Sequence, residues 1–313
     1  MKVAIVGAGG VGGYFGGRLA QAGEDVVFIA RGEHLRAMQR NGLRVDSING
    51  DFRIDRVLAT DDPATAGEVD YVLVAVKSWQ LRDAIETMRP MVGKTTSIVP
   101  LLNGVEAPDH LANIFGAERV LGGTCSVISM IAGPGHVRHA GAQPTIKFGE
   151  LDHRRSERGE RLRNAFSRTE GVQVEIPENI HVAMWNKYIF IAPWSGVGAV
   201  TRAPAGVTRS LPETRAMLEH AMEEISLLAR ARKVAMDREA VPRAMAFIDA
   251  LPYEGTASMQ RDIMAGRPSE LDAQNGTVVR LGKEAGVATP VNGMIYSSLL
   301  PLERRARKEV HFD

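Results

Sequence analysis

The chain begins with the run Lys2-Val-Ala-Ile-Val6, followed at once by Gly7-Ala8-Gly9-Gly10-Val11-Gly12, and this stretch decides the fold. The first run is short, apolar and β-branched, which predicts a buried strand, and residues 11–22 have the apolar spacing of a helix that ends at Gly23. A Gly-x-Gly-x-x-Gly loop is a weak signal alone. Placed between a strand and a helix, it predicts a dinucleotide-binding unit.

Each glycine of this loop has a physical reason. Gly7 is expected to permit the tight turn, Gly9 to let the main chain approach a pyrophosphate, and Gly12 to let the helix pack closely on the strand. The phosphates are then expected at the helix N-terminus, whose N–H groups and macrodipole favour negative charge. The residues expected to contact the cofactor here form one run: Gly7, Ala8, Gly9, Gly10, Val11 and Gly12.

The residue after the second predicted strand, residues 25–30, indicates which dinucleotide binds. An NAD enzyme usually has an acidic residue there, which binds the 2′-hydroxyl of the ribose. In this chain that place, 19 residues past Gly12 (31 − 12 = 19), is taken by Arg31. A guanidinium binds a 2′-phosphate through charge-assisted hydrogen bonds, so the sequence predicts NADP(H). Glu33, two residues further on, keeps NAD open as the alternative.

The two halves of the chain differ in their apolar pattern. Up to Pro177, short apolar runs alternate with helical stretches, which predicts an α/β fold with a parallel sheet. The runs are continuously apolar, so helices are expected on both faces of a doubly wound, Rossmann-type sheet, with residues 120–149 adding mixed or antiparallel strands at one edge. After Pro177 the apolar spacing is helical. We therefore expect an NADP-binding domain over residues 1–177 and an all-helical substrate domain over residues 178–313.

Composition argues against several classes of protein. The 313 residues carry 38 Lys and Arg against 37 Asp and Glu, a net charge of +1, so a nucleic-acid partner is not expected. No apolar run approaches the roughly 20 residues of a membrane helix, so no membrane partner is expected either. Cys125 is the single cysteine and the histidines are scattered, which gives no disulfide and no metal site. The simplest localisation is cytoplasmic.

Five further motifs follow the glycine loop and Arg31 in a fixed order. They are Val76-Lys77-Ser78-Trp79-Gln80, Leu102-Asn103-Gly104, Trp185-Asn186-Lys187, Ser258-Met259-x-x-Asp262 and Glu270-x-Asp272-x-x-Asn275-Gly276. In this order and spacing the set resembles the ketopantoate reductase (2-dehydropantoate 2-reductase) family over nearly the whole chain. The resemblance implies reduction of ketopantoate to pantoate by NADPH, a step of pantothenate biosynthesis. It also implies a site in the cleft between a Rossmann-type domain and a helical domain like that of 6-phosphogluconate dehydrogenase.

The resemblance further implies roles for five matched positions. Lys187 matches the lysine that donates a proton to the reduced carbonyl oxygen, and Glu270 matches an acid that contacts the cofactor, so these two are the expected catalytic residues. Asn103 matches an asparagine that touches cofactor and substrate, and Lys77 matches a lysine on the cofactor side. Ser258 matches a serine that binds the substrate carboxylate, and its distance to the glutamate (270 − 258 = 12) agrees with the family.

The residue types also suit this chemistry on physical grounds. A hydride that reaches a ketone carbon leaves developing negative charge on the oxygen, and the site must stabilise that charge. An ammonium group can do so and can then donate the proton. Lys187 has apolar neighbours in its predicted helix, such as Val182, Trp185 and Ile189, which favour a partly buried amine.

Two positions depart from the family pattern. Its best-known members have asparagines four and eight residues beyond the lysine, where this chain has Ile191 and Ser195. Ser195 is still expected to bind substrate, but an isoleucine cannot hydrogen-bond a substrate hydroxyl. Either the pocket supplies that contact from elsewhere, or the preferred small-molecule substrate is a different 2-oxo acid.

Two further questions stay open. A non-catalytic dinucleotide sensor is a third function, which the presence of both Lys187 and Glu270 disfavours. Long amphipathic helices such as residues 213–233 could pack inside the helical domain or against a second subunit, so the sequence does not decide between a monomer and a homodimer.

Overall fold

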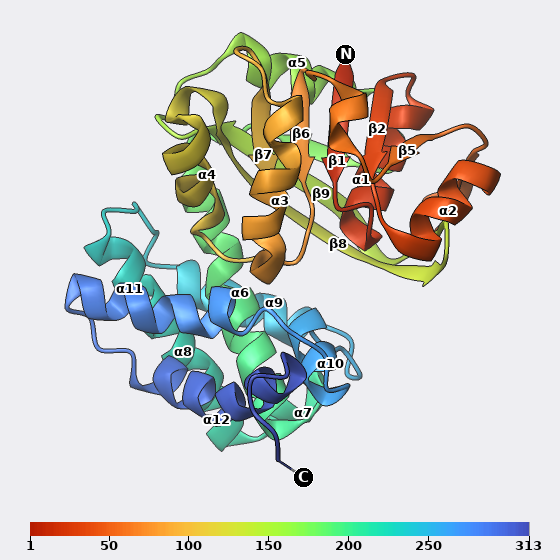
Figure 1. The fold of residues 1–313 in the computed structure, drawn as a ribbon. Coiled ribbons are helices and arrows are strands. Elements are labelled where there is room, and N and C mark those ends of the chain that lie inside the picture. Colours follow the sequence, from red (N-terminus) through yellow and green to blue (C-terminus); the bar gives the residue numbers. More distant parts are fainter. Residues whose placement is uncertain (313) are drawn as a thin grey trace. The chain divides into compact units, whose positions relative to one another are not determined.

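The computed structural model describes residues 1–312, with the Ala142 side chain left aside. Its contacts divide the chain into two compact units. Unit 1 comprises residues 1–102 and 107–180, and unit 2 comprises residues 103–106 together with the chain from His181 onward. Figure 1 shows all the labelled strands in unit 1 and a set of helices in unit 2.

Unit 1 is built on a five-stranded parallel sheet with the strand order β5-β2-β1-β6-β7. The strands are β1 (Lys2–Val6), β2 (Asp25–Ile29), β5 (Leu58–Thr60), β6 (Tyr71–Val74) and β7 (Ser97–Pro100). Successive residues of β1 are buried in two different apolar clusters, Ile5 in one and Ala4 in the other. The sheet is therefore covered on both faces, which confirms the doubly wound, Rossmann-type fold.

Different helices supply the two clusters. The cluster around Ile5 takes apolar residues from α1 (Gly10–Gln21), α2 (Gly32–Asn41) and α5 (Glu157–Ser167). The cluster around Ala4 takes them from α3 (Leu81–Met88) and α4 (Ala107–Phe115). These helices bury their apolar faces on the sheet, as the continuous apolar strands of the sequence predicted.

The strands predicted at residues 120–149 belong to a second, mixed sheet. They are β8 (Leu121–Gly133) and β9 (His136–Glu150), an antiparallel hairpin that begins beside β7 through a parallel bridge between Ile98 and Val120. The second sheet has the order β10-β9-β3-β4, with β8 paired to β9. Its other strands are β3 (Leu43–Ser47), β4 (Phe52–Ile54) and β10 (Gln173–Glu175). The parallel pairing of β9 with β3 joins distant segments, which periodicity alone does not reveal.

The regular elements described in unit 2 are all helices, which confirms the expected all-helical second domain. The helices are α6 (Ile180–Thr201, the first residue in unit 1), α7 (Ala205–Ser210), α8 (Pro212–Ala231), α9 (Ala240–Ala250), α10 (Ser258–Met264), α11 (Thr277–Ala285) and α12 (Pro290–Ala306). A π-helical turn, Asp272–Gly276, leads directly into α11. None of the helices described in the chain is long and apolar enough to cross a membrane.

The segment Asn103–Glu106 is assigned to unit 2 although it follows β7. Its last residue, Glu106, accepts hydrogen bonds on Oε2 from Thr277 Oγ1 at 2.5 Å and from Arg280 Nη2 at 2.8 Å. The sequence placed one boundary near Pro177 and put this segment in the first domain. In the structure, these four residues belong to unit 2. The chain from Ala107 to Ile180 belongs to unit 1, and unit 2 begins again at His181.

Candidate functional site

Three predicted cofactor-binding positions lie just after strands of the parallel sheet of unit 1, at the edge where these strands end. The glycine loop follows β1, Arg31 follows β2 and Lys77 follows β6, and β1 lies between β2 and β6. The register pairs Val6, the last residue of β1, with Ile29 and with Val74. In doubly wound sheets, ligands bind at the carboxyl ends of the strands where the order of strands reverses, and β1 and β6 flank that point here.

The glycine loop has room for a ligand at one position only. A Cβ atom on Gly12 would lie 2.1 Å from the carbonyl oxygen of Gly7, and one on Gly7, whose φ is +97°, would lie 2.9 Å from that of Ala75. A Cβ on Gly9 would meet no protein atom within 4 Å. Fold geometry therefore requires Gly7 and Gly12, whereas the space at Gly9 suits a phosphate group of the dinucleotide.

The N-terminus of α1 is suited to an anion. Gly9 is its N-cap residue and supplies no side-chain cap, and the first turn carries no acidic residue. The first N–H groups of the helix are therefore available to a phosphate. Sequence reasoning missed a second feature of this loop: a Cβ on Gly10 would lie 2.4 Å from the carbonyl oxygen of Ser129 in β8. Gly10 is needed so that the hairpin can approach the start of α1.

Arg31 and Glu33 have different environments at the start of α2. Arg31 is exposed, is the N-cap residue of the helix, and donates from Nη2 to Thr87 Oγ1 at 3.4 Å. Glu33 accepts a hydrogen bond from Arg36 Nε at 2.8 Å, and this bond and the charge of Arg36 lower the pKa of its carboxyl. The carboxylate that kept NAD open is thus engaged by Arg36, and the exposed guanidinium favours a 2′-phosphate.

Lys77 lies in the turn that follows β6. It is half-buried, and its main-chain N–H donates to Gln80 Oε1 at 3.2 Å. The Gln80 side chain therefore fixes the turn that carries the lysine. This geometry keeps Lys77 at the carboxyl edge of the sheet, on the opposite side of β1 from Arg31.

In unit 2 the structure brings two predicted residues into direct contact. Asn103 Nδ2 donates to Glu270 Oε2 at 2.8 Å. Gly104, with φ of +97°, follows the asparagine, and a Cβ there would lie 2.8 Å from the carbonyl oxygen of Ala273. The glycine thus allows the Asn103 turn to lie against the π-helical turn that follows Glu270. Glu270 is buried, with 4% of its surface exposed.

Lys187 is half-buried on α6, and hydrogen bonds tie its helix to the same π-helical turn. The adjacent Tyr188 donates from its hydroxyl to the carbonyl oxygen of Gln274 at 2.5 Å, and Asn275 Nδ2 donates to that of Ala192 at 3.4 Å. Burial raises the pKa of Tyr188 well above its ordinary value, so its hydroxyl stays a donor. The helix of Lys187 and the turn after Glu270 therefore form one hydrogen-bonded framework.

The predicted substrate-binding serines differ in burial. Ser258 is the first residue of α10 and is half-buried, whereas Ser195 on α6 is fully buried. The Ser195 hydroxyl has no hydrogen-bond partner among the described residues. Ile191 is half-buried on the same helix. A substrate could reach Ser195 only if neighbouring side chains moved, which makes it the weakest of the predicted contacts.

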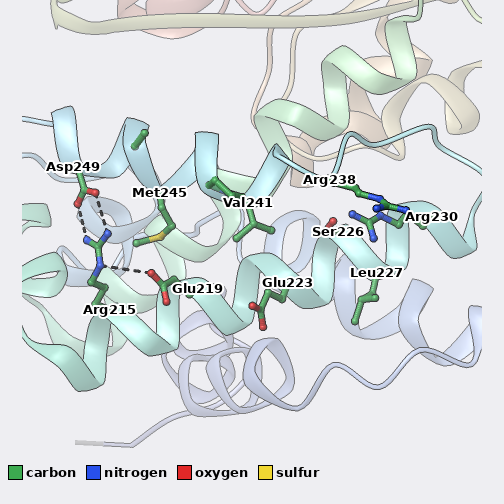
Figure 2. Close-up of a pocket in the computed structure, with 12 residues that line it drawn as sticks. Arg215, Glu219, Glu223, Ser226, Leu227, Arg230, Arg238, Val241, Met245 and Asp249 are labelled. Atoms are coloured by element: carbon green, nitrogen blue, oxygen red, sulfur yellow. Dashed lines mark hydrogen bonds and ion pairs between the residues drawn. The ribbon is translucent and has the colours of Figure 1, made fainter.

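Unit 2 also has a groove of about 690 Å³ along α8 and α9 (Figure 2). At one end Arg215 binds both oxygens of Asp249, at 2.6 and 3.0 Å, and lies 3.5 Å from Glu219. Figure 2 shows Arg230 and Arg238 at the other end. None of the residues predicted from the sequence lines this groove. Two of its acidic side chains, Glu219 and Asp249, are paired with Arg215.

Comparison with known proteins places the chain in a family. Residues 3–153 match the family model described as Ketopantoate reductase PanE/ApbA, and residues 179–303 match Ketopantoate reductase PanE/ApbA C terminal. A Bacillus subtilis (strain 168) protein named Uncharacterized oxidoreductase YkpB is 32% identical, over 96% of this chain and 98% of its own length.

Solved structures agree. The crystal structure of 2-dehydropantoate 2-reductase from Geobacter metallireducens GS-15 is 34% identical with a TM-score of 0.90, covering 96% of this chain and 99% of that one. A ternary structure of D-mandelate dehydrogenase with NADH and anilino(oxo)acetate shares the fold, with 23% identity, a TM-score of 0.89 and coverage of 98% and 100%. The chain therefore belongs to the ketopantoate reductase family and is an NADP-dependent oxidoreductase that acts on a small 2-oxo acid.

Proposed function

We propose that the chain reduces ketopantoate to pantoate with NADPH and that Lys187 is the proton donor. The observation that carries this proposal is the hydrogen bond of 2.8 Å between Asn103 and Glu270, in the turn to which the helix of Lys187 is tied. An amide, a carboxylate and an ammonium group are thereby held in one unit. A protein that only sensed dinucleotide would need neither Lys187 nor Glu270.

Residues of unit 1 hold the cofactor in this proposal. The N–H groups at the start of α1 would bind the pyrophosphate, for which Gly9 leaves space, and Arg31 would bind the 2′-phosphate. Lys77 adds a positive charge at the same edge of the sheet. When bound, NADPH supplies a hydride to the carbonyl carbon of the substrate.

Residues of unit 2 complete the reaction. The Lys187 ammonium stabilises the negative charge that grows on the carbonyl oxygen and donates its proton to that oxygen, so that hydride and proton together give the 2-hydroxy acid. The amine then recovers a proton from solvent. Ser258 binds the substrate carboxylate, and Glu270 orients the Asn103 amide by accepting its hydrogen bond.

Turnover and binding measured on the same variants test this proposal. Lys187→Met keeps the length of the side chain and removes its charge, so kcat with ketopantoate should fall by about 10²–10⁴ while NADPH affinity is retained. Lys283→Met, at an exposed lysine on α11, is the matched control and should behave like the wild type. NADPH binding without turnover of any 2-oxo acid in a broad panel would instead favour the sensor.

Ile191 supports a second candidate, a reductase of a 2-oxo acid without a hydroxyl group. Four residues from Lys187 is about 6 Å along a helix, within reach of the same substrate, and Ile191 offers it only apolar surface. The test compares ketopantoate with 3,3-dimethyl-2-oxobutanoate, the same acid without the hydroxyl. A site that binds the hydroxyl should discriminate by about 10⁴-fold, whereas an apolar pocket should discriminate by about 10²-fold or less. A small ratio that Ile191→Asn shifts towards ketopantoate would select this candidate.

A further inference from the structure

Ser269, the residue before Glu270, is bound by two charged side chains at the C-terminal end of α12, Glu303 and the C-cap residue Arg307. The Glu303 carboxylate accepts the Ser269 N–H on both oxygens, at 3.1 and 3.0 Å, and the Ser269 hydroxyl on Oε2 at 2.5 Å. Arg307 donates from Nε to Glu303 Oε1 at 2.7 Å and from Nη2 to the Ser269 carbonyl oxygen at 3.1 Å. The Glu303–Arg307 pair therefore engages the N–H, the carbonyl and the hydroxyl of one residue.

This arrangement is built into the interior of unit 2. Glu303 is 4% exposed and Ser269 is fully buried. A buried carboxylate is costly unless charge and hydrogen bonds compensate it, and here one guanidinium and three hydrogen bonds from Ser269 do so. Breaking such a pair leaves a buried charge uncompensated, so the position of Ser269 is strongly determined.

The main chain on both sides of Glu270 is fixed as a result. The Ser269 hydroxyl donates to Glu303 and also accepts the N–H of Leu271 at 3.2 Å. One hydroxyl thus links the residue before Glu270 to the residue after it. Glu270 lies between these two residues, and its carboxylate accepts a hydrogen bond from the Asn103 amide at 2.8 Å.

A second set of hydrogen bonds fixes the segment that precedes Ser269. Arg267 donates to Asp262 Oδ1 from Nε at 3.1 Å and from Nη2 at 2.8 Å, and its N–H donates to the Asp262 carbonyl oxygen at 2.9 Å. Asp262 lies on α10, the helix that begins at Ser258. The segment between the end of α10 and Glu270 is therefore fixed at both of its ends.

We propose that Glu303 and Arg307 are positioning residues for the reductase: they hold Ser269 so that the Glu270 carboxylate keeps the direction in which it accepts the Asn103 amide. This inference rests on the proposed function and on the cofactor contact that the family resemblance implies for Glu270. Neither residue touches the cofactor itself. Their effect follows from geometry, because a carboxylate that is no longer held in direction loses its contact, and one hydrogen bond to a charged group is worth about 10- to 100-fold in affinity.

Glu303→Gln tests the proposal, because it keeps the shape of the side chain and removes its charge and one acceptor. NADPH affinity, measured by fluorescence titration without substrate, should weaken at least about tenfold, since the Glu270 carboxylate is no longer held in direction. KM for NADPH should rise by the same factor and more steeply than kcat falls. Glu303→Asp, which keeps the charge, should recover part of the affinity.

Glu224→Gln is the matched control. Glu224 is a carboxylate of the same unit with 6% of its surface exposed, and it accepts the N–H groups of Val291 and Asn292 at 2.7 and 3.0 Å, at the start of α12. Both variants should lower Tm, because both disturb a buried carboxylate of unit 2. Only Glu303→Gln should weaken NADPH binding, and equal weakening in both variants would overturn the proposal.

Two more variants separate the possible failures. Ser269→Ala removes only the hydroxyl, folds with its main-chain hydrogen bonds retained, and should weaken NADPH binding by a smaller factor than Glu303→Gln. If Glu270→Gln weakens NADPH binding and Glu303→Gln does not, the positioning role is overturned and the proposed function stands. If Glu270→Gln itself changes neither binding nor turnover, the role of Glu270 is wrong and the positioning proposal falls with it.

Discussion

The side-chain amide of Asn103 donates a hydrogen bond of 2.8 Å to the carboxylate of Glu270, across 167 positions of the chain. The asparagine follows a strand of the Rossmann-type sheet, yet both residues belong to the helical unit. A carboxylate needs a donor when it is buried, and Asn103 supplies one. This contact joins two residues that the sequence could only propose separately.

Replacing this donor by a second carboxylate should make the protein sensitive to pH. In Asn103→Asp two carboxyl groups would lie at hydrogen-bond distance, so one of them should keep a proton well above the usual range. A pKa that is raised in the folded state makes the folded protein bind more protons, so stability falls as the pH rises from the unfolded pKa of about 4 through the raised folded value. The loss in Tm relative to the wild type should therefore be larger at pH 8 than at pH 5.

Asn103→Ala is the control for that experiment. It removes one hydrogen bond to a charged group, worth about 1.5–3 kcal/mol, and adds no titrating group. Its loss in Tm should be nearly independent of pH. An Asn103→Asp offset that is also constant across this range would contradict the predicted coupling.

The glycine loop allows a separation of binding from stability. At Gly9 a Cβ meets no protein atom and φ is −76°, so Gly9→Ala should keep the free energy of unfolding within about 1 kcal/mol of the wild type. NADPH affinity should fall at least about tenfold, because the methyl group occupies the space for the pyrophosphate. Gly12→Ala should instead destabilise the fold by roughly 1–3 kcal/mol, since its Cβ would overlap the Gly7 carbonyl. Urea unfolding and NADPH titration of both variants check this, and equal stability losses would refute it.

Arg31 should control the choice between the two nicotinamide cofactors. Arg31→Ala removes charge-assisted hydrogen bonds to the 2′-phosphate, so KM for NADPH should rise about 10- to 100-fold while KM for NADH changes little. Arg40→Ala, at another exposed arginine of α2, should change neither value. A wild type that prefers NADH, or equal effects in the two variants, would show that Arg31 does not bind the phosphate.

Protonation of His34 should lower the free energy of unfolding in weak acid. Its Nδ1 accepts the N–H of Gly135 at 3.1 Å, and burial lowers its pKa below the ordinary value of 6.5. The folded state then binds fewer protons than the unfolded state, so this stabilisation is complete above pH 6.5 and is lost as the pH falls towards the folded pKa. His34→Asn keeps an acceptor but does not titrate. Its Tm should fall less than that of the wild type between pH 7 and pH 5, and parallel curves would exclude this role.

Much of the fold and part of the site follow from local sequence patterns. The glycine loop, Arg31 and the continuous apolar strands are read over a few residues, because strand and helix periodicities act at that range. The separate roles of the loop glycines could be predicted for the same reason, and the open space at Gly9 agrees with them. Motif order led to the family, which the comparisons confirmed.

Other features had no local signal. Asn103–Glu106 belongs to the helical unit because of hydrogen bonds to residues far along the chain, such as Thr277. The pairing of β9 with β3, the contact of β8 with Gly10 and the Glu303–Arg307 pair likewise join distant segments. Periodicity reports which face of an element is apolar, and it contains no information about which partner covers that face.

The sequence by itself predicted a dinucleotide-binding loop at residues 7–12, a preference for NADP(H) with NAD left open by Glu33, and a helical unit after the sheet. These follow from residue type and short spacing, which set the turn, the charge and the periodicity directly. Only the tertiary structure decided that Asn103 meets Glu270 and that Glu303 and Arg307 hold the residue beside it. Such contacts form when the folded chain buries distant polar groups together, because each buried group then needs a partner.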